Sequence, residues 1–353
     1  LIKKINSIQF NCKKITFLDL FNSKKLNNIK NIESNNIGYL IYTSGTISVP
    51  KGVGITHSNY IFTAKNIIQK LNYVESDVNL IALPLSHSFG LGCLHVSLFL
   101  GSTVILVENT SDIELLLDLT TKNNATTIAA VPITLNKIIQ KKNLNLEEKL
   151  KNIRLIITNS TSISVETVKA YQDIFQNGKL ATYYGLTEAS RSTFMIFNIT
   201  GKEKSVGVPP DGIQIKIDNN VKNELETGEI MIKGKNVIDK YWNNRDADKL
   251  IVNSWLRTGD LGHKDSDGYL YLDGRSDYLI NIAGEKVMPE EIERVVKVLT
   301  GIKEVVAIGE TNEMFGQVVK LFIQKTANSK LKKSDVLTHC IANLERFEVP
   351  RVI

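Results

Sequence analysis

The feature that most constrains the fold is an alternation of short apolar runs and amphipathic runs between residues 37 and 185. Apolar runs rich in β-branched and aromatic residues, which predict buried strands, cover 38–42, 79–85, 103–108, 126–131, 154–159 and 180–184. Between them, residues 59–71, 111–121 and 164–176 have helical spacing, with Ser58 as the expected N-cap of the first. Such alternation is typical of a doubly wound, mostly parallel α/β sheet.

The pattern changes near residue 200, where short strands with glycine turns replace the alternation. These strands are predicted at 212–217, 228–234 and 268–275 and indicate a small β-rich subdomain. A second mixed unit follows, with helices predicted at 289–299 and 334–344. We therefore divide the chain into an α/β part (1–200), a β-rich subdomain (201–275) and a smaller α+β C-terminal domain (276–353).

Composition narrows the class of partner and the compartment. The net charge of +6 over 353 residues is modest and the lysines are dispersed, which argues against nucleic acid and is compatible with a polyanionic small molecule. The three cysteines show no zinc-ligand spacing with the histidines, so reduced thiols and a cytoplasmic location are expected. No apolar run has transmembrane length, and no transmembrane segment is predicted.

The segment 42–52, YTSGTISVPKG, is a candidate phosphate-binding loop. It is expected to follow the carboxyl end of a strand, where open α/β sheets bind ligands. The hydroxyls of Thr43, Ser44 and Thr46 and the backbone at Gly45 can face an anion, and Lys51 adds a mobile positive charge. A Walker loop needs glycine before the lysine and Ser or Thr after it, and this segment has neither.

The order of small residues, proline and lysine in this loop resembles the adenylate-forming superfamily of acyl- and aryl-CoA synthetases. Further segments that resemble the motifs of this superfamily follow in the expected order: PLSHSFG (84–90), TNSTSIS (158–164), YYGLTE (183–188), SVGVP (205–209), GEIMIKG (228–234), YW (241–242), WLRTGDLG (255–262) and YLDGRSDYLINIAGEKVMPEEIE (271–293). The resemblance runs from about residue 37 to the last residue.

The resemblance implies an AMP-forming acid–thiol ligase. Such an enzyme uses ATP and Mg²⁺ to convert a carboxylic acid to an acyl-adenylate, and then passes the acyl group to the thiol of CoA or of a carrier protein's phosphopantetheine. The first step develops charge on phosphoryl oxygens and depends on positioning and cations more than on a protein nucleophile. In this scheme the α/β part and the β-rich subdomain form the AMP-binding domain, and the C-terminal domain is mobile.

The resemblance also implies roles for individual residues. Glu188 is the expected Mg²⁺ ligand, and Thr187, Lys51 and His87 complete the expected catalytic set, although a buried structural role for His87 is equally well supported. The other residues expected to contact ATP or CoA are Thr43, Ser44, Gly45, Thr46, Ser160, Thr161, Tyr183, Tyr184, Gly185, Asp260, Arg275, Asp277, Gly284 and Lys286.

Three of these contacts concern the nucleoside. Tyr184 is expected to stack on adenine, while Asp260 accepts hydrogen bonds from the ribose hydroxyls, as an acceptor-only carboxylate can. Arg275 is expected to reach the ribose or the phosphates, with a surface salt bridge as its alternative.

Three others concern the second half-reaction. Asp277 aligns with the hinge about which the C-terminal domain turns. Gly284 aligns with a glycine that lines the pantetheine tunnel, and Lys286 is either nearby support or a solvated lysine.

Two departures from the superfamily pattern bear on activity. Ile47 and Ser48 stand where Thr-Gly is usual, which removes one hydroxyl and stiffens the loop. Residues RFEVPRVI (346–353) resemble a superfamily segment that precedes the catalytic lysine, and the sequence stops before that lysine. At the other end, the chain begins with Leu1. We therefore expect a chain that is truncated at both ends, and its own activity is in question.

Two alternative functions stay open. The first is a carrier-loading or peptide-synthetase adenylation domain, although PLSHSFG lacks the aspartate typical of amino-acid activation. The second is a degenerate adenylate-binding module without catalysis. The acyl pocket is expected near residues 87–95, 159–163 and 183–192, with Arg191 nearby, and does not distinguish aryl, medium-chain and longer acids.

Overall fold

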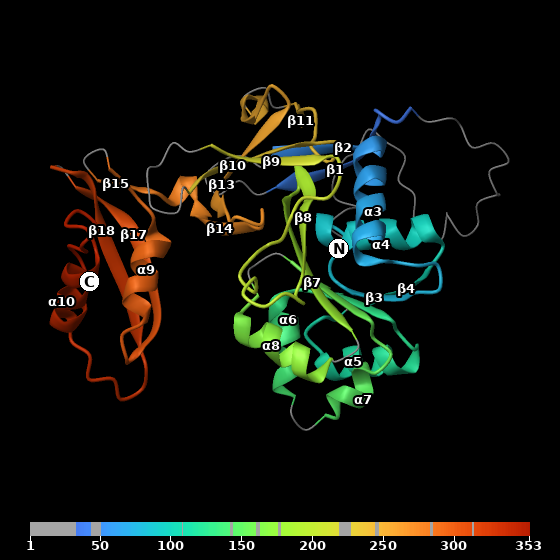
Figure 1. The fold of residues 1–353 in the computed structure, drawn as a ribbon, viewed down its shortest axis with the longest axis horizontal. Helices are drawn as coiled ribbons and strands as arrows, with labels where there is room; N and C mark the ends of the chain where they lie inside the picture. Colours follow the sequence, from blue (N-terminus) through green and yellow to red (C-terminus); the bar gives the residue numbers. More distant parts are fainter. Residues whose placement is uncertain are drawn as a thin grey trace, which may run out of the picture.

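The computed structural model describes residues 33–43, 51–107, 109–141, 144–159, 163–175, 178–218, 227–243, 247–282, 285–312 and 314–353. Within these residues the strands form four sheets (Figure 1). The largest is a six-stranded sheet that confirms the predicted doubly wound α/β architecture.

The central sheet has the strand order β4-β3-β5-β6-β7-β8. Its strands are β3 (Val78–Ala82), β4 (Thr103–Leu106), β5 (Thr127–Ala130), β6 (Leu155–Thr158), β7 (Lys179–Leu186) and β8 (Ala189–Ile196). All neighbouring strands are parallel except β7 and β8, which form an antiparallel hairpin at one edge. Strands β5 and β6 are buried along their whole length, as expected for a sheet covered on both faces.

Helices cover both faces of this sheet (Figure 1). On one face pack α5 (Ile113–Lys122), α6 (Pro132–Gln140), α7 (Leu146–Leu150) and α8 (Val165–Ile174), around a core that includes Leu116, Leu135 and Tyr171. On the other face pack α3 (His57–Leu71) and α4 (Ser88–Leu100), around a second core that includes Ile67 and Phe89. The two cores bury the alternate side chains of the same strands.

The start of α3 corrects one prediction. Thr56, not Ser58, is its N-cap. The Thr56 hydroxyl accepts a hydrogen bond from the Asn59 backbone N–H at 3.1 Å, and the Asn59 side-chain oxygen accepts one from the Thr56 backbone N–H at 3.0 Å. This reciprocal capping box satisfies two N–H groups at once, whereas Ser58 lies inside the first turn.

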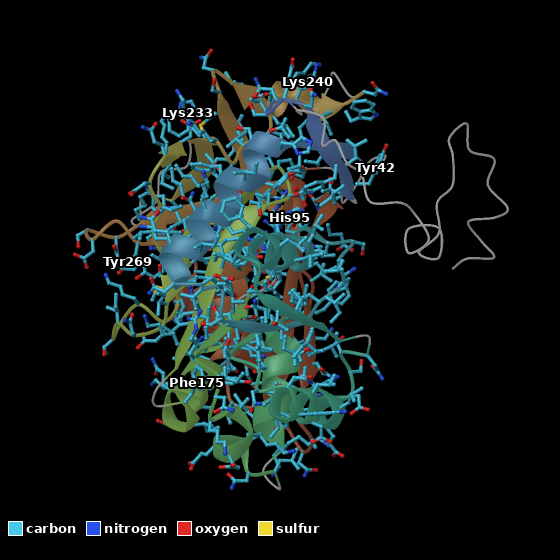
Figure 2. The ribbon with its side chains drawn as sticks, turned by 90° about the vertical axis from the view of Figure 1, so that its right-hand side faces the viewer. Tyr42, His95, Phe175, Lys233, Lys240 and Tyr269 are labelled. Carbon is cyan, nitrogen blue, oxygen red and sulfur yellow. The ribbon has the colours of Figure 1, made fainter. Side chains whose placement is uncertain are left out.

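Strand β1 (Ile37–Thr43) corrects a second prediction. It lies outside the parallel sheet and pairs antiparallel with β2 (Lys51–Thr56), which also pairs with β11 (Tyr241–Trp242). Segment 38–42 is therefore not a buried strand, and Tyr42 is 62% exposed at the end of β1 (Figure 2). The candidate phosphate-binding loop thus connects the strands of a hairpin, and its residues 44–50 lie outside the described part of the chain.

Helix α4 and strand β8 were not predicted from the sequence. The α4 sequence SFGLGCLHVSLFL is apolar on every side and contains two glycines, so it shows no amphipathic period. Its N-cap is His87, and α4 covers Tyr183 of the central sheet, with a Phe89–Tyr183 ring separation of 5.3 Å.

The β-rich subdomain is built around a second antiparallel sheet of order β12-β13-β10-β9, with β14 paired to β13. Its strands are β9 (Ile213–Asp218), β10 (Gly228–Gly234), β12 (Ile251–Val252), β13 (Trp255–Lys264) and β14 (Leu270–Arg275), and the short 3₁₀ helix η1 covers Ala247–Leu250. Because β11 pairs with β2, this region is joined directly to the start of the α/β part.

The C-terminal part forms a fourth sheet of order β16-β15-β18-β17. It contains η2 (Ser276–Tyr278), β15 (Ile280–Ile282), β16 (Glu285–Val287), α9 (Pro289–Lys297), β17 (Ile302–Asn312), β18 (Gly316–Lys325) and α10 (Lys333–Asn343). Among the described residues, its hydrophobic core draws on side chains between Ile280 and Ile353. We propose on this basis to keep the division of the chain at residue 275, and to keep the division at residue 200 because β8 belongs to the central sheet and β9 to the antiparallel one.

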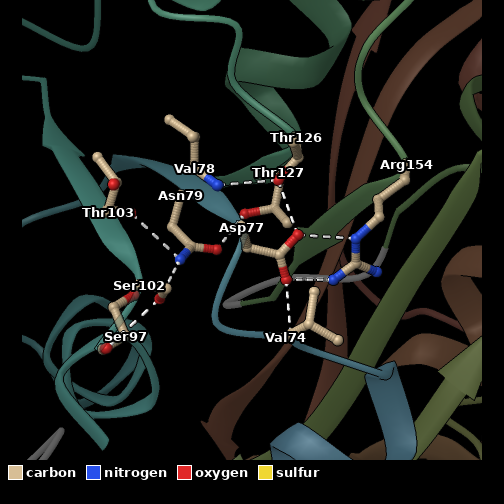
Figure 3. Close-up of polar contacts among 10 residues, drawn as sticks. All are labelled: Val74, Asp77, Val78, Asn79, Ser97, Ser102, Thr103, Thr126, Thr127 and Arg154. Atoms are coloured by element: carbon tan, nitrogen blue, oxygen red, sulfur yellow. Dashed lines mark hydrogen bonds and ion pairs between the residues drawn. The ribbon is translucent and has the colours of Figure 1, made fainter. Parts of the chain in front are cut away.

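A buried carboxylate ties together the amino ends of three parallel strands (Figure 3). Asp77, which is 2% exposed, accepts hydrogen bonds from Arg154 Nε at 2.8 Å, from Arg154 Nη2, from the Val74 N–H at 2.8 Å and from the Thr126 hydroxyl at 2.8 Å. These partners precede β3, β5 and β6. Burial alone raises the pKa of Asp77, but the hydrogen bonds outweigh burial and place its pKa below the ordinary value.

Replacing Asp77 with Asn should lower the free energy of unfolding by about 2–3 kcal/mol, because the charge of Arg154 is then left without a counter-charge. Arg154 is one-third exposed, so the expected loss is smaller than for a fully buried ion pair. The stabilisation by Asp77 is complete above about pH 4 and is lost as the pH falls through its lowered folded-state pKa. The difference between the two proteins in urea unfolding should therefore shrink below about pH 4. Asp118→Asn, which breaks an exposed pair with Lys149, is the control and should cost below about 1 kcal/mol. Equal losses for both variants would contradict the assignment.

Candidate functional site

A cleft of about 990 Å³ lies where the β7–β8 hairpin, the start of α4 and strands β13 and β14 meet. Predicted residues that line it are Thr43, Lys51, His87, Tyr183, Tyr184, Gly185, Thr187, Glu188, Asp260 and Arg275. They come from segments that are more than 200 positions apart in the sequence. The structure therefore brings most of the predicted site residues into one cavity, and this size is in the range of small-molecule sites.

The β7–β8 hairpin supplies the centre of the site. Tyr183 and Tyr184 are consecutive in β7 and point to opposite faces, so Tyr183 packs with α4 and Tyr184 packs with the β-rich subdomain. A Cβ at Gly185 would lie 2.6 Å from the Ala189 carbonyl oxygen, so the tight approach of the two strands requires glycine there. Thr187 and Glu188 then occupy the turn between the strands.

Asp260 links the two sheets across the cleft. Its Oδ2 accepts a hydrogen bond from the Tyr184 hydroxyl at 2.6 Å, and its Oδ1 accepts one from Arg275 Nη1 at 2.8 Å. Burial and the adjacent Asp260 charge raise the pKa of Tyr184 well above its ordinary value, so Tyr184 stays a donor. The preceding Gly259 has φ +72°, a conformation that favours glycine. The Asp260–Tyr184–Arg275 group is thus held in place, and its contact with a nucleoside stays a prediction.

Glu188 and Lys51 meet at Tyr241. Glu188, 9% exposed, accepts a hydrogen bond from the Tyr241 hydroxyl at 3.0 Å, and Lys51 Nζ lies 5.8 Å from the centre of the Tyr241 ring. In the described residues no group of three or more His, Cys, Asp or Glu side chains could hold a metal ion. A lone carboxylate beside a wide cleft fits Mg²⁺, which usually takes one or two carboxylates and completes its shell with phosphate oxygens and water.

His87 caps a helix, but it is an exposed residue and not the buried histidine that the sequence left open as the alternative. Its Nδ1 accepts a hydrogen bond from the Phe89 backbone N–H at 3.2 Å and so caps α4. Partial desolvation of the imidazole, followed by the nearby Arg191 charge, lowers the pKa of His87, which favours the neutral ring that capping needs. Because His87 also lines the cleft, its catalytic role stays a prediction beside this structural one.

Several predicted residues cannot be placed. Ser44, Gly45, Thr46, Ser160, Thr161 and Gly284, together with the atypical pair Ile47 and Ser48, lie outside the described residues. The same is true of the side chains of Asp277 and Lys286, although the backbone of Asp277 lies in η2. No helix in the described residues is long and apolar enough to cross a membrane.

Three residues of the site were not assigned a role from the sequence. Tyr241 was noted only as part of the YW motif, and its contact with Glu188 depends on the pairing of β11 with β2. Thr258 donates to the Ile230 carbonyl and accepts from the Asp260 N–H at 3.0 Å. Arg191 was placed near the acyl pocket, but its burial was not predicted.

Two substitutions of His87 test its role as a helix cap without measuring catalysis. His87→Ala should lower the free energy of unfolding by about 1 kcal/mol at pH 8. His87→Asn keeps a side-chain acceptor for the cap and should lower it by only roughly a few tenths of a kcal/mol. Because the folded-state pKa is lowered, the stabilisation by wild-type His87 is present above about pH 6.5 and is lost as the pH falls through that pKa. Urea unfolding at pH 8 and pH 5 measures both effects. A larger loss for Asn than for Ala would contradict the cap.

Known proteins resemble this chain over most of its length. Residues 7–242 match the family model described as AMP-binding enzyme. The 2-succinylbenzoate–CoA ligase of Bacillus subtilis is 32% identical over 88% of this chain, and the long-chain-fatty-acid–CoA ligase of Escherichia coli O6:H1 is 31% identical over 90%. The chain spans 63% and 58% of the length of these two relatives.

Solved structures agree with the fold. O-succinylbenzoate coenzyme A synthetase from Bacillus subtilis, in complex with ATP and magnesium ion, matches with a TM-score of 0.77 and 28% identity over 95% of this chain and 70% of that chain. ATP-bound MatB from Rhodopseudomonas palustris matches with a TM-score of 0.78 and 26% identity over 91% of this chain and 64% of that chain. The family model covers more than half of the sequence, so this chain belongs to the AMP-binding enzyme family.

Proposed function

We propose that this protein is an AMP-forming ligase that activates a carboxylic acid with ATP and transfers the acyl group to a thiol. The observation that carries the proposal is the convergence of Lys51, Thr187 and Glu188 with the Asp260–Arg275 pair in one cleft. The first group provides a cation, a hydroxyl and a metal-binding carboxylate for phosphates. The second provides a fixed acceptor for ribose hydroxyls.

In the first step, an oxygen of the substrate carboxylate attacks the α-phosphorus of ATP, and the bond from that phosphorus to the pyrophosphate oxygen breaks. Lys51 and Thr187 stabilise the charge on the phosphoryl oxygens, and Asp260 fixes the ribose so that attack is in line. Glu188 would hold Mg²⁺, which supplies charge neutralisation for the phosphates.

In the second step, a thiolate attacks the acyl carbonyl carbon and AMP leaves, so an acid anhydride is exchanged for a thioester. We propose CoA as the thiol because the curated relatives at 31–32% identity are CoA ligases. A carrier protein's phosphopantetheine would present the same thiol and is the alternative acceptor. Nucleic acid is not a proposed partner.

We also propose a cytoplasmic location. The two cysteines in the described residues, Cys93 and Cys340, are both free and buried, which suits a reducing compartment.

The binding of AMP tests the nucleotide site directly. Asp260→Asn should weaken AMP binding about 10- to 100-fold, because it replaces a charged acceptor of two hydroxyl bonds with an amide. Asp273→Asn is the matched control. Asp273 also carries two side-chain partners in the same subdomain, the Thr227 hydroxyl and His263 Nδ1, but it lies outside the cleft. Calorimetric titration should therefore show near-wild-type affinity for the control, and equal weakening in both variants would contradict the assigned site.

Exchange of radioactive pyrophosphate into ATP, with Mg²⁺ and a panel of carboxylic acids, tests the reaction itself. Exchange that depends on one class of acid supports the ligase. AMP binding without exchange for any acid would contradict acyl activation by this chain and favour an adenylate-binding module.

A further inference from the structure

Arg191 is a buried cation with no anionic partner among the described residues. It is 2% exposed, and no carboxylate of the described chain forms an ion pair with it. Its Nε–H is buried and has no hydrogen-bond acceptor. Burying a guanidinium without a counter-charge is costly, so natural proteins rarely leave one unpaired without a function.

The protein holds this guanidinium in a fixed position. Arg191 Nη1 donates to the Ser88 carbonyl at 2.9 Å and to the Ser190 hydroxyl at 2.7 Å, and Nη2 donates to the Phe89 carbonyl at 2.9 Å. The guanidinium carbon lies 4.6 Å from the centre of the Tyr183 ring. These neutral groups orient the cation and leave its charge unbalanced.

The backbone at Arg191 has an energetically unfavourable conformation. Arg191 has φ +54°, a left-handed conformation that is unfavourable for a residue with a side chain. At Gly92 on α4, a Cβ would lie 2.5 Å from both Nη1 and Nη2, so the guanidinium keeps its present position only with glycine there. A solvated surface arginine needs neither a left-handed backbone nor a glycine in the facing helix.

A small cavity adjoins the guanidinium. It has a volume of about 20 Å³, and its lining combines polar groups, among them Arg191, Ser88 and His95, with the apolar side chains of Ile55, Ala64 and Ile67; His95 on α4 is labelled in Figure 2. It shares Ser88, Thr187 and Ser190 with the large cleft, so it lies next to the region where the acid is activated. This volume is little more than one water molecule needs, so it admits only a small group and excludes an alkyl chain.

The groups that face Arg191 supply no negative charge. No carboxylate is among the described residues that line the small cavity. Burial, followed by Arg191, lowers the pKa of His95 to about 4, and burial raises the pKa of Tyr39 to about 12, so both rings are neutral at pH 7. Burial also raises the pKa of the adjacent Cys93 thiol, which stays protonated.

We propose that Arg191 pairs with a second carboxylate at the far end of the substrate, so that the preferred acids are short dicarboxylic acids. One carboxylate enters the cleft and is activated, and the other balances the charge of Arg191. A longer apolar tail does not fit the small cavity beside Arg191. This inference rests on the proposed ligase function and narrows its substrate class. Guanidinium groups are suited to this task because they bind carboxylates with charge-assisted hydrogen bonds.

Stable analogues of acyl-adenylates test the inference without requiring turnover. Sulfamoyladenosine carrying a propionyl group and the same compound carrying a malonyl group differ only in a terminal methyl or carboxylate. Wild-type protein should bind the carboxylate-ended analogue at least about 10-fold more tightly, the advantage typical of a charged hydrogen bond. Arg191→Gln should remove this preference while binding of AMP changes by less than about 3-fold. The butyryl and succinyl pair repeats the comparison with one more methylene.

Three results would overturn the inference. Equal affinity of wild-type protein for both analogues would do so, as would a preference that survives Arg191→Gln, or tighter binding of a palmitoyl analogue than of the malonyl one. In each of these cases AMP would still bind, so the proposed function would stand. Loss of AMP binding in the wild-type protein would instead overturn both.

Two further variants protect the test against a folding defect in Arg191→Gln. Arg191→Lys keeps the charge and should retain part of the preference for the carboxylate-ended analogue. Gly92→Ala leaves Arg191 in the sequence but displaces its guanidinium, and should reduce the preference without changing the net charge. A merely structural Arg191 would instead lower the stability of these variants and leave the ratio of the two affinities unchanged.

Discussion

The Asp77 carboxylate is the constraint on which the geometry of the site depends. It binds the backbone before β3, the hydroxyl of Thr126 before β5 and the guanidinium of Arg154 before β6 (Figure 3). Parallel strands that start at a common level and have similar lengths also end at a common level. The carboxyl ends of the sheet therefore open toward the cleft, which is where open α/β sheets bind ligands.

The site is completed by contacts between sheets, not within one. The Tyr184 hydroxyl reaches from the central sheet to Asp260 on β13, while the Tyr241 hydroxyl reaches from β11 to Glu188 at the hairpin turn. Both contacts use the polar tip of an aromatic side chain whose ring is buried, which joins packing and positioning in one residue. The nucleotide contacts predicted from single motifs therefore depend on the relative placement of three sheets.

The sequence predicted the elements whose patterns are local. The runs that became β5 and β6 are continuous and apolar because both faces are buried, and α8 was predicted from its helical spacing, although Ser164, predicted inside the helix, is its N-cap. The assignment of β1 to the parallel sheet was wrong because strand pairing is non-local, and an apolar run does not specify its neighbour. Helix α4 was missed because it lacks the polar face that reveals a helix: even its exposed positions Leu98 and Phe99 are apolar. The residues that line the cleft were predicted from their motifs, but the partners Tyr241 and Thr258 depend on strand pairing that no single motif encodes.

Two arginines of the α/β part, Arg154 and Arg191, show how the fold treats charge in opposite ways. Arg154 is balanced inside the protein by Asp77, and this pair serves the alignment of strands. Arg191 is equally fixed, by two carbonyls, a hydroxyl and an aromatic ring, but the described residues supply it with no anion. A protein that needed only packing at this position could use an apolar side chain there without the cost of desolvation or a left-handed backbone. The charge of Arg191 is therefore best explained by a ligand that completes the pair, so that the binding of substrate balances a charge that folding leaves unbalanced.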